Sequence, residues 1–374
     1  MKITGIETLP LRIPFKEAFT IAAPYEKSRN HLDCLVIKIH TDDGIFGIGE
    51  TQAWRRQGSA EILPNLVKTM KEIYEPILIG KSPFQINEIM NLLNCAVYNS
   101  LYAQAAVGDA LYDLMGKYYK VPVYQLLGGK CREKVQVGIV VSISADPDAM
   151  LYKAQEFYEQ GYRYIRIKIG IDPDVDARNA KAFKEYFGDR VVLRADANAG
   201  LSYPDALRLL KKLEPYDFDM VEQLVSLWDL RGMADLCRHT SIPISADESL
   251  SNIHSLMDII QARAASIIQT KTGKNGGIYY TRQLWTIAHA AGIQIFPGNH
   301  PSTSIAGASV THLCASWAGC MMVGDYQNGL YDVLSEDVVT QPLKVKDGYV
   351  AVPDLPGLGV ELDEDKIRLF RADC

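Results

Sequence analysis

The strongest constraint on the fold is a regular alternation of strand and helix patterns from about Val135 to Leu334. Amphipathic helical patterns such as PDAMLYKAQEFYEQG and YPDALRLLKKLEPY separate short runs rich in β-branched residues, which is typical of βα units. Eight such units predict a parallel (β/α)8 barrel. A doubly wound sheet is the competing arrangement, but no glycine-rich dinucleotide fingerprint follows an early strand. The predicted strands are QVGIVVSI, YRYIRIKIG, RVVLRADA, FDMVEQ, IPISADE, ASIIQTK, GIQIFPG and GCMMVGD.

The segments on either side of this region have different patterns of apolar residues. Three alternating runs, ITGIETLPLRI, HLDCLVIKIHT and IFGIGE, predict a β-meander. Helical periodicity follows in ILPNLVKTMKEIYEPIL and in AQAAVGDALYDLMGKYYK. The stretch LKVKDGYVAVPDLPGLGVELDEDKI predicts a hairpin plus a loop. We therefore predict an α+β domain over 1–130, a barrel over 131–340, and a C-terminal segment over 341–374 that packs back on the first domain.

Charge and composition exclude several classes of partner. The net charge of −6 provides no basic field for nucleic acid, and no Lys/Arg cluster with interleaved aromatic residues occurs. No apolar run approaches the roughly 18–20 residues of a membrane helix, and the N-terminus lacks the apolar core of a secretory signal. The seven cysteines form no CxxC motif, which favours free thiols in a reducing compartment. We expect a cytoplasmic protein with no nucleic-acid or membrane partner.

Ionisable side chains stand late in five successive predicted strands. They are separated by 28, 26, 25 and 24 residues, close to one βα unit each. A closed parallel barrel would bring all five to its carboxyl-terminal rim, on which barrel enzymes carry their chemistry. The alternation in YRYIRIKIG turns Arg166 and Lys168 toward the barrel interior, while the isoleucines face the helices. The five residues are Lys168, Asp196, Glu222, Asp247 and Lys271.

The carboxylates of Asp196, Glu222 and Asp247 would repel one another on a shared rim unless positive charge neutralises them. A divalent cation does so economically, and all-oxygen ligands suit Mg2+, with Mn2+ as the other candidate. No cysteine or histidine stands at the equivalent places, which argues against zinc. Salt bridges to neighbouring lysines are the competing explanation for each acid taken singly.

Lys168 and Lys271 flank the carboxylates, one on the strand before them and one on the strand after. A lysine is a poor base at neutral pH, but desolvation and a nearby cation lower its pKa. One lysine could then remove a proton α to a substrate carboxylate, and the other could return one from the opposite face. The carbanion requires a metal to take up the enediolate charge. The alternative is that both lysines are only counter-ions to the acids.

The chain resembles the enolase superfamily and, within it, the muconate lactonizing enzyme (muconate cycloisomerase) subgroup of the mandelate racemase/muconate lactonizing enzyme family. The resemblance rests on ALYDLMGKYYKVPVYQLLGG, RIK at the lysine motif, DAN, VEQ, ADES, KTGKNGG and DLPGLGVE. It implies an α+β capping domain over a modified (β/α)7β TIM barrel. In this superfamily a lysine base works with Mg2+, so the resemblance assigns the metal to the three carboxylates and proton transfer to the two lysines. Arg166 replaces the first lysine of the motif, and its permanent charge should lower the pKa of Lys168.

The same resemblance indicates where a substrate would be contacted. Two loops of the capping domain, TIAAPYEKS and ETQAWRRQG, correspond to those that select substrates in the family. The adjacent Arg55 and Arg56 could bind a second carboxylate, or belong to a solvated loop. His300, in FPGNHPSTS, could contact substrate or serve only the loop structure. The auxiliary candidates are Arg166, Asn198, Glu248, Asn299, His300, Asp325, Tyr25, Trp54 and Arg55.

These features predict proton transfer next to the carboxylate of a small-molecule substrate, through an enediolate. Cycloisomerisation or racemisation/epimerisation of a (di)carboxylate or an amino-acid derivative ranks first. Dehydration of a hydroxy acid, such as a sugar acid or a hydroxyproline-type compound, ranks second because the same site serves both. Hypotheses from other classes are a Schiff-base aldolase using Lys271 and a non-catalytic binding barrel. Oligomers are common among such relatives, so we expect a homo-oligomer.

Overall fold

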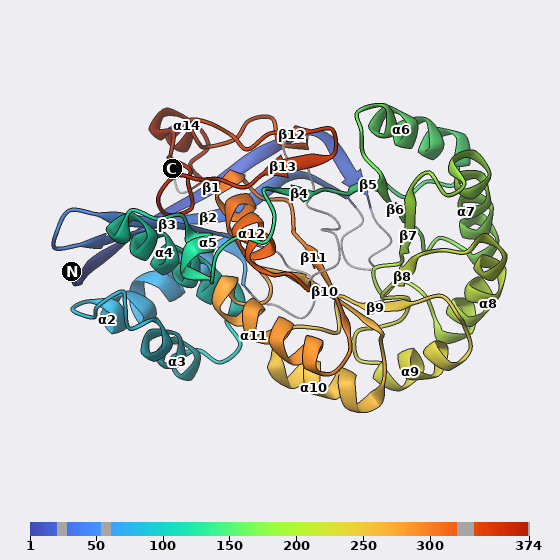
Figure 1. Ribbon diagram of the computed structural model, residues 1–374, viewed down its shortest axis with the longest axis horizontal. Coiled ribbons are helices and arrows are strands. Elements are labelled where there is room, and N and C mark those ends of the chain that lie inside the picture. The colour runs from blue at the N-terminus through green and yellow to red at the C-terminus, as the bar shows by residue number, and fades with distance from the viewer. Residues whose placement is uncertain (21–27, 54–60, 320–332, 373–374) are drawn as a thin grey trace.

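The computed structural model describes residues 1–20, 28–53, 61–319 and 333–372. In this part of the chain the strands form an N-terminal three-stranded sheet, a seven-stranded parallel sheet and a small three-stranded sheet (Figure 1). The N-terminal sheet and its helices lie on one side of the molecule, and the parallel sheet curls inside an arc of helices (Figure 1). The protein is therefore of mixed α/β class.

The predicted N-terminal meander is confirmed. Its strands pair antiparallel in chain order and are β1 (Ile3–Thr20), β2 (Ser28–Thr41) and β3 (Phe46–Gln52). Alternate residues of β2, such as Leu35, Ile37 and Ile39, are buried against the helices that follow, because successive side chains of a strand point to opposite faces. These helices are α1 (Leu63–Lys68), the π-helical η1 (Thr69–Tyr74), α2 (Glu75–Leu78), α3 (Ile86–Ala96), α4 (Leu101–Tyr119) and α5 (Val123–Leu126).

Helix α4 is buried between the N-terminal sheet and the helices of the parallel sheet. Two glycines of β3 permit its close approach, since a Cβ at Gly49 would lie 2.0 Å from the carbonyl oxygen of Ala106. On the other side, the carboxylate of Asp109 accepts a hydrogen bond from Ile278 N (2.8 Å) at the start of α11 (Gly277–Ala290). The small and apolar residues around α4 allow both contacts at once.

The seven-stranded sheet is parallel, and each strand pairs with its neighbours in the chain, in the order β11-β10-β9-β8-β7-β6-β5. The outer helices cover one face of this sheet (Figure 1). Its strands are buried along nearly their whole length, which indicates that the other face is covered as well. The strands are β5 (Ile139–Val141), β6 (Tyr164–Lys168), β7 (Val192–Asp196), β8 (Met220–Glu222), β9 (Ile244–Ala246), β10 (Ile267–Lys271) and β11 (Gln294–Gly298).

The first two outer helices begin directly after aspartates that act as N-caps. Asp146 and Asp172 each accept hydrogen bonds from the first turn of the helix that follows, and each precedes a proline, which suits the first helical position. Besides α11, the helices are α6 (Pro147–Glu159), α7 (Pro173–Phe187), α8 (Tyr203–Leu213), the 3-10 turn η2 (Glu214–Tyr216), α9 (Leu230–Arg238), α10 (Ile253–Ala262) and α12 (Ser304–Ser316). Within the described ranges, none is long and apolar enough to cross a membrane.

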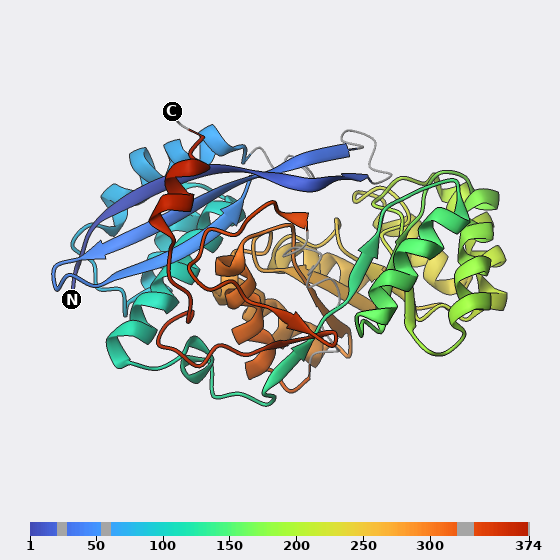
Figure 2. The ribbon, with the colours of Figure 1, turned by 90° about the horizontal axis from the view of Figure 1, so that it is seen from above.

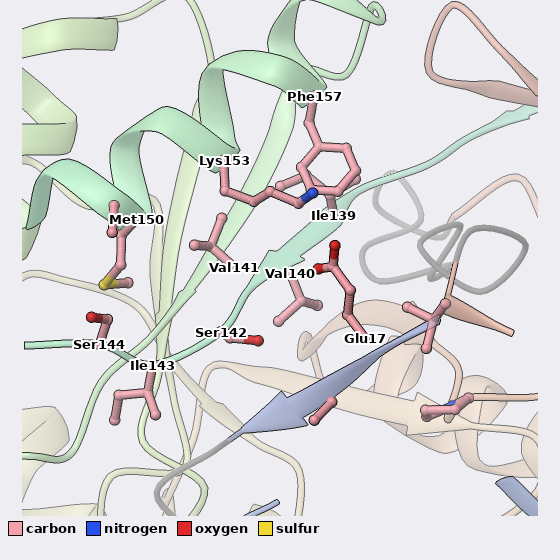
Figure 3. Close-up of a pocket in the computed structure, with 14 residues that line it drawn as sticks. Glu17, Ile139, Val140, Val141, Ser142, Ile143, Ser144, Met150, Lys153 and Phe157 are labelled. Carbon is pink, nitrogen blue, oxygen red and sulfur yellow. The ribbon is translucent and has the colours of Figure 1, made fainter. Parts of the chain in front are cut away.

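Two predicted barrel strands differ from expectation. The run QVGIVVSI is not one strand, because it divides into β4 (Lys134–Gln136) and β5, and β4 joins the small sheet instead. The eighth predicted strand, GCMMVGD, lies outside the described residues except for its first residue. Within the described part, β5 pairs with β6 alone. A cavity of about 310 Å3 lies along β5 and α6, lined by Ile139, Val141 and Met150 among others (Figure 3).

The C-terminal segment contacts both β4 and the N-terminal sheet. The predicted hairpin is present as β12 (Val345–Lys346) and β13 (Tyr349–Ala351), but β13 pairs with β4 rather than with the N-terminal sheet. Helix α14 (Glu364–Leu369) lies over the N-terminal sheet (Figure 2), where Lys38 Nζ donates to Glu364 Oε1 at 2.8 Å. Beyond it, Arg12 N donates to Phe370 O at 2.9 Å.

A buried carboxylate joins the N-terminal sheet to α12. Glu50, on β3, accepts hydrogen bonds from Thr303 N (3.0 Å), Thr303 Oγ1 (2.6 Å) and Ala306 N (3.0 Å). Burial raises the pKa of Glu50, while the three donors favour its ionised form. Since Thr303 is the N-cap of α12, Glu50 completes the cap from another sheet and holds the loop that follows β11.

Asp109 predicts a pH dependence of stability. Burial raises its pKa to about 7, whereas an unfolded aspartate titrates near 3.9, so the folded protein holds a proton that the unfolded chain has lost between these values. Stability should therefore fall as pH rises from about 4 through about 7, by up to about 4 kcal/mol from this group. Urea unfolding at pH 5 and pH 8 should show a smaller loss for Asp109→Asn than for the wild type. An equal loss in both proteins would contradict this origin.

Candidate active site

The carboxyl ends of β6 to β10 bring the five predicted residues to one rim. The strand register places Lys168 opposite Asp196, and Asp196 opposite Glu222. Asp247 follows β9 by one residue, and Lys271 ends β10. All five side chains are buried, at no more than 5% relative exposure. The spacing of the sequence thus predicted a real juxtaposition, because parallel strands end on the same side of a sheet.

One group of contacts surrounds Asp196 and Glu222. Lys168 Nζ donates to Asp196 Oδ2 at 2.5 Å and to Asn198 Oδ1 at 2.7 Å. A nitrogen of the Arg166 guanidinium lies 2.9 Å from Glu222 Oε1 and 3.0 Å from Asp196 Oδ2. Arg166 and Lys168 therefore point inward from β6, as their alternation with isoleucine predicts.

A second group surrounds Asp247, and it contains a residue that the sequence reasoning missed. Lys271 Nζ pairs with Asp247 Oδ2, and Lys274 Nζ donates to Asp247 Oδ1 at 2.6 Å. Asn275 ties the turn to the strand, since its Oδ1 accepts from Lys271 N at 2.8 Å. Lys274 belongs to the motif KTGKNGG. It lies three residues beyond the end of a strand, where the direction of a side chain depends on the conformation of the turn. A second lysine in that motif was the available signal.

Gln223 is the other residue that sequence reasoning missed. Its Oε1 accepts from Asp247 N (3.0 Å) and Ser249 N (3.1 Å), and its Nε2 donates to Ser249 Oγ (2.8 Å). Its backbone has a φ of 36°, in the left-handed region that non-glycine residues seldom adopt. Gln223 therefore fixes the position of Asp247 relative to Glu222 from the neighbouring strand.

The pKa values of the acids shift in different directions because the partners of the acids differ. Burial raises the pKa of Glu222 well above its usual range, despite the charge of Arg166. Burial and the nearby charges of Asp247 and Asp196 raise the pKa of Glu248 to about 7. Burial also opposes ionisation of Asp196 and Asp247, but their lysine partners outweigh it and lower both pKa values. Carboxylates with pKa values shifted in opposite directions within one site are a feature of catalytic centres.

The two lysines also differ from each other. Burial, followed by repulsion from Arg166, lowers the pKa of Lys168, in the direction expected from the arginine in the RIK motif. Burial opposes the charge of Lys271 as well, but attraction by Asp247, Glu222 and Glu248 raises its pKa. The pKa of Lys168 is therefore shifted in the direction that a base requires, whereas that of Lys271 is shifted the other way because three carboxyl groups attract its charge.

The remaining candidates fall into three places. Asn198 Nδ2 donates to Glu248 Oε1 at 3.1 Å, so both residues belong to the cluster. Asn299 and His300 are buried after β11, where Asn299 donates to Ser302 Oγ at 2.8 Å. The His300 ring stacks on Tyr102 of α4, with centroids 6.1 Å apart. The candidates that lie outside the described residues are Tyr25, Trp54, Arg55, Arg56 and Asp325.

The donor set fits a hard divalent cation. Within the described residues no three His, Cys, Asp or Glu side chains are grouped as metal ligands, and Asp196, Glu222 and Asp247 pair with lysine or arginine. Their oxygens are nevertheless hard donors, fully buried at adjacent strand ends. Nearby Glu248 Oε2 is a buried acceptor with no hydrogen-bond partner among the described residues. A buried acidic oxygen left unsatisfied is what a cation or its bound water would serve.

Comparisons with known proteins identify the family. Residues 7–128 match the N-terminal domain of the mandelate racemase / muconate lactonizing enzyme family, and residues 149–366 match the enolase C-terminal domain-like family. The N-succinyl-L-Arg/Lys racemase of Bacillus cereus is 30% identical, over 98% of this chain and 97% of that protein. Its crystal structure superposes with a TM-score of 0.93 over 100% of this chain and 98% of that one.

Two further solved structures are similar over nearly the whole chain. The muconate lactonizing enzyme of Pseudomonas fluorescens, complexed with muconolactone, has a TM-score of 0.93 at 28% identity, covering 99% of each chain. The dipeptide epimerase of Enterococcus faecalis, complexed with Mg and the dipeptide L-Leu-L-Tyr, has a TM-score of 0.89 at 28% identity, covering 96% of this chain and 100% of that one. These relatives are isomerases, which confirms the predicted enzyme class. The chain belongs to the mandelate racemase/muconate lactonizing enzyme family of the enolase superfamily.

Proposed function

We propose that this protein is a Mg2+-dependent isomerase that transfers a proton at the carbon α to a substrate carboxylate. The observation that carries the proposal is the placement of Lys168 and Lys271, which end strands on either side of three buried carboxylates. Asp196, Glu222 and Asp247 are the residues that would hold the ion. When bound, Mg2+ would supply positive charge beside the substrate carboxylate, where the enediolate charge develops.

The two lysines would act from opposite faces of the α-carbon. Lys168, whose pKa is lowered by burial and by Arg166, is suited to accept a proton near neutral pH. Lys271 keeps its proton more strongly and is suited to donate one. Racemisation or epimerisation uses both residues in alternation, whereas cycloisomerisation requires proton transfer by only one. The five side chains of the rim are buried, which would limit the access of water to the reactive carbanion.

The relatives favour two classes of substrate. Muconate lactonizing enzymes act on a dicarboxylate, while the racemase and the epimerase act on N-acylated amino acids and dipeptides by their names. We rank racemisation or epimerisation of an amino-acid derivative and cycloisomerisation of a dicarboxylate together as the function of this chain. We also propose that the parallel sheet belongs to a closed (β/α)7β barrel, since β5 pairs only with β6 within the described residues.

Hydrogen exchange at the α-carbon tests the proposal directly. N-acyl amino acids, dipeptides, muconates and hydroxy acids would be incubated in deuterated buffer with Mg2+, and deuterium incorporation would be followed by mass spectrometry. With a chiral substrate, Lys168→Ala and Lys271→Ala should each slow exchange from one enantiomer by about 100-fold or more, because each removes one acid/base group. Lys212→Ala, which removes a lysine paired with Asp174 on the outer helices, should exchange like the wild type. Unchanged exchange in both active-site variants would refute the acid/base assignment.

Metal affinity tests the ligand set separately. Asp196→Asn should weaken Mg2+ binding by more than about 100-fold in calorimetric titration without substrate, since loss of a mere outer-shell partner already costs 10–100-fold. Asp176→Asn is the matched control, because Asp176 is also a buried carboxylate but binds the backbone after β6. Full Mg2+ affinity in Asp196→Asn would remove this residue from the site. Activity that survives a chelator, with borohydride trapping of Lys271, would support the aldolase instead.

A further inference from the structure

Lys168 has two acceptors that differ in what they can do during a reaction. One is Asp196 Oδ2, a proposed metal ligand, and the other is the side-chain oxygen of Asn198 at 2.7 Å. An oxygen that coordinates a cation is less available to the lysine. Asn198 is therefore the contact that would orient the Lys168 amine while the metal is bound.

The side-chain amide of Asn198 can present either its oxygen or its NH2 group to Lys168. The backbone of Asn198 is held in the left-handed region, with a φ of 45°, and its N–H donates to Asp196 Oδ1 at 2.8 Å. The orientation of the amide thus depends on its other end, where Nδ2 donates to Glu248 Oε1 at 3.1 Å. A charged Lys168 selects the amide oxygen by itself, but an uncharged Lys168 amine could also accept from the NH2 group, so the acceptor on Glu248 is what would then keep the oxygen toward Lys168.

We propose that Glu248 is a positioning residue for Lys168, acting through the Asn198 amide. Glu248 lies one residue beyond Asp247, is 6% exposed, and reaches across from the end of β9 to the turn after β7. Its bond to Asn198 is the only hydrogen bond of its side chain among the described residues, since Oε2 has no partner there. Lys271 has no hydrogen bond to this pair and is oriented by Asp247. The inference rests on the proposed function and assigns Glu248 to one of its two proton-transfer faces.

Two variants separate the hydrogen bond from the charge. Glu248→Gln removes the negative charge but keeps an oxygen acceptor for Asn198, whereas Glu248→Met has similar length and no comparable acceptor. Both remove the attraction that Glu248 exerts on Lys271, so a difference confined to the enantiomer that Lys168 serves reports the hydrogen bond. Exchange of each enantiomer is measured for both variants, and Lys168→Ala identifies the enantiomer that Lys168 serves.

Glu248→Met should exchange the Lys168-dependent enantiomer about 100-fold more slowly than Glu248→Gln, because small misplacements of a catalytic group have effects of this size. The two variants should exchange the other enantiomer equally, which also shows that the Met variant is folded. Equal exchange of the Lys168-dependent enantiomer by both variants, or equal slowing of both enantiomers by Met, would overturn the proposal.

Crystal structures of the two variants provide a readout that does not require activity. The Lys168–Asn198 contact should persist in Glu248→Gln and be lost in Glu248→Met. If the contact persists in both, Glu248 does not position Lys168, whatever the reaction. If the lysine variants leave exchange unchanged but the contact is lost as expected, the proposed function fails and the positioning role stands.

Discussion

Mutual neutralisation of buried acids and bases at one rim of the parallel sheet is the interaction on which the site depends. Asp196, Glu222 and Asp247 have no exposed surface, and ionised groups so placed are costly unless paired. Arg166 and Lys168 serve the first two acids, while Lys271 and Lys274 share the third. Because every charge relies on another, the proposed cation would redistribute the whole set and would free a lysine from its carboxylate partner for the proposed proton transfer.

The N-terminal domain holds this rim in place through buried polar contacts. Glu50 caps α12 from β3, and Asp109 on α4 binds the first turn of α11. The loop with Asn299 and His300 lies directly before the cap that Glu50 completes. A carboxylate buried at a helix N-terminus gains from the unpaired N–H groups there, so these contacts give specific docking as well as attraction. The N-terminal domain thus contacts α11 and α12, the helices that follow β10 and β11.

Most of the fold could be predicted from local patterns. The meander, the capping helices and the order of the βα units follow from apolar periodicity, and Asp-Pro pairs mark the starts of α6 and α7. The division of QVGIVVSI into β4 and β5 could not be predicted, because both halves have the same alternation and the partner of β4 comes from about 200 residues later. The pairing of β13 with β4 was missed for the same reason.

By itself, the sequence determined which ionisable residues meet. A strand-to-strand spacing near 25 residues and the carboxyl-end rule place Lys168, Asp196, Glu222, Asp247 and Lys271 together without any side-chain detail. Only the tertiary structure decided how they pair and which auxiliary residues join them. Lys274, Gln223 and the Asn198–Glu248 bond depend on turns whose backbone direction is set by packing, and the opposite pKa shifts of the two lysines depend on distances to each acid. Electrostatic energies vary steeply with such distances when water is excluded, and periodicity carries no information about them.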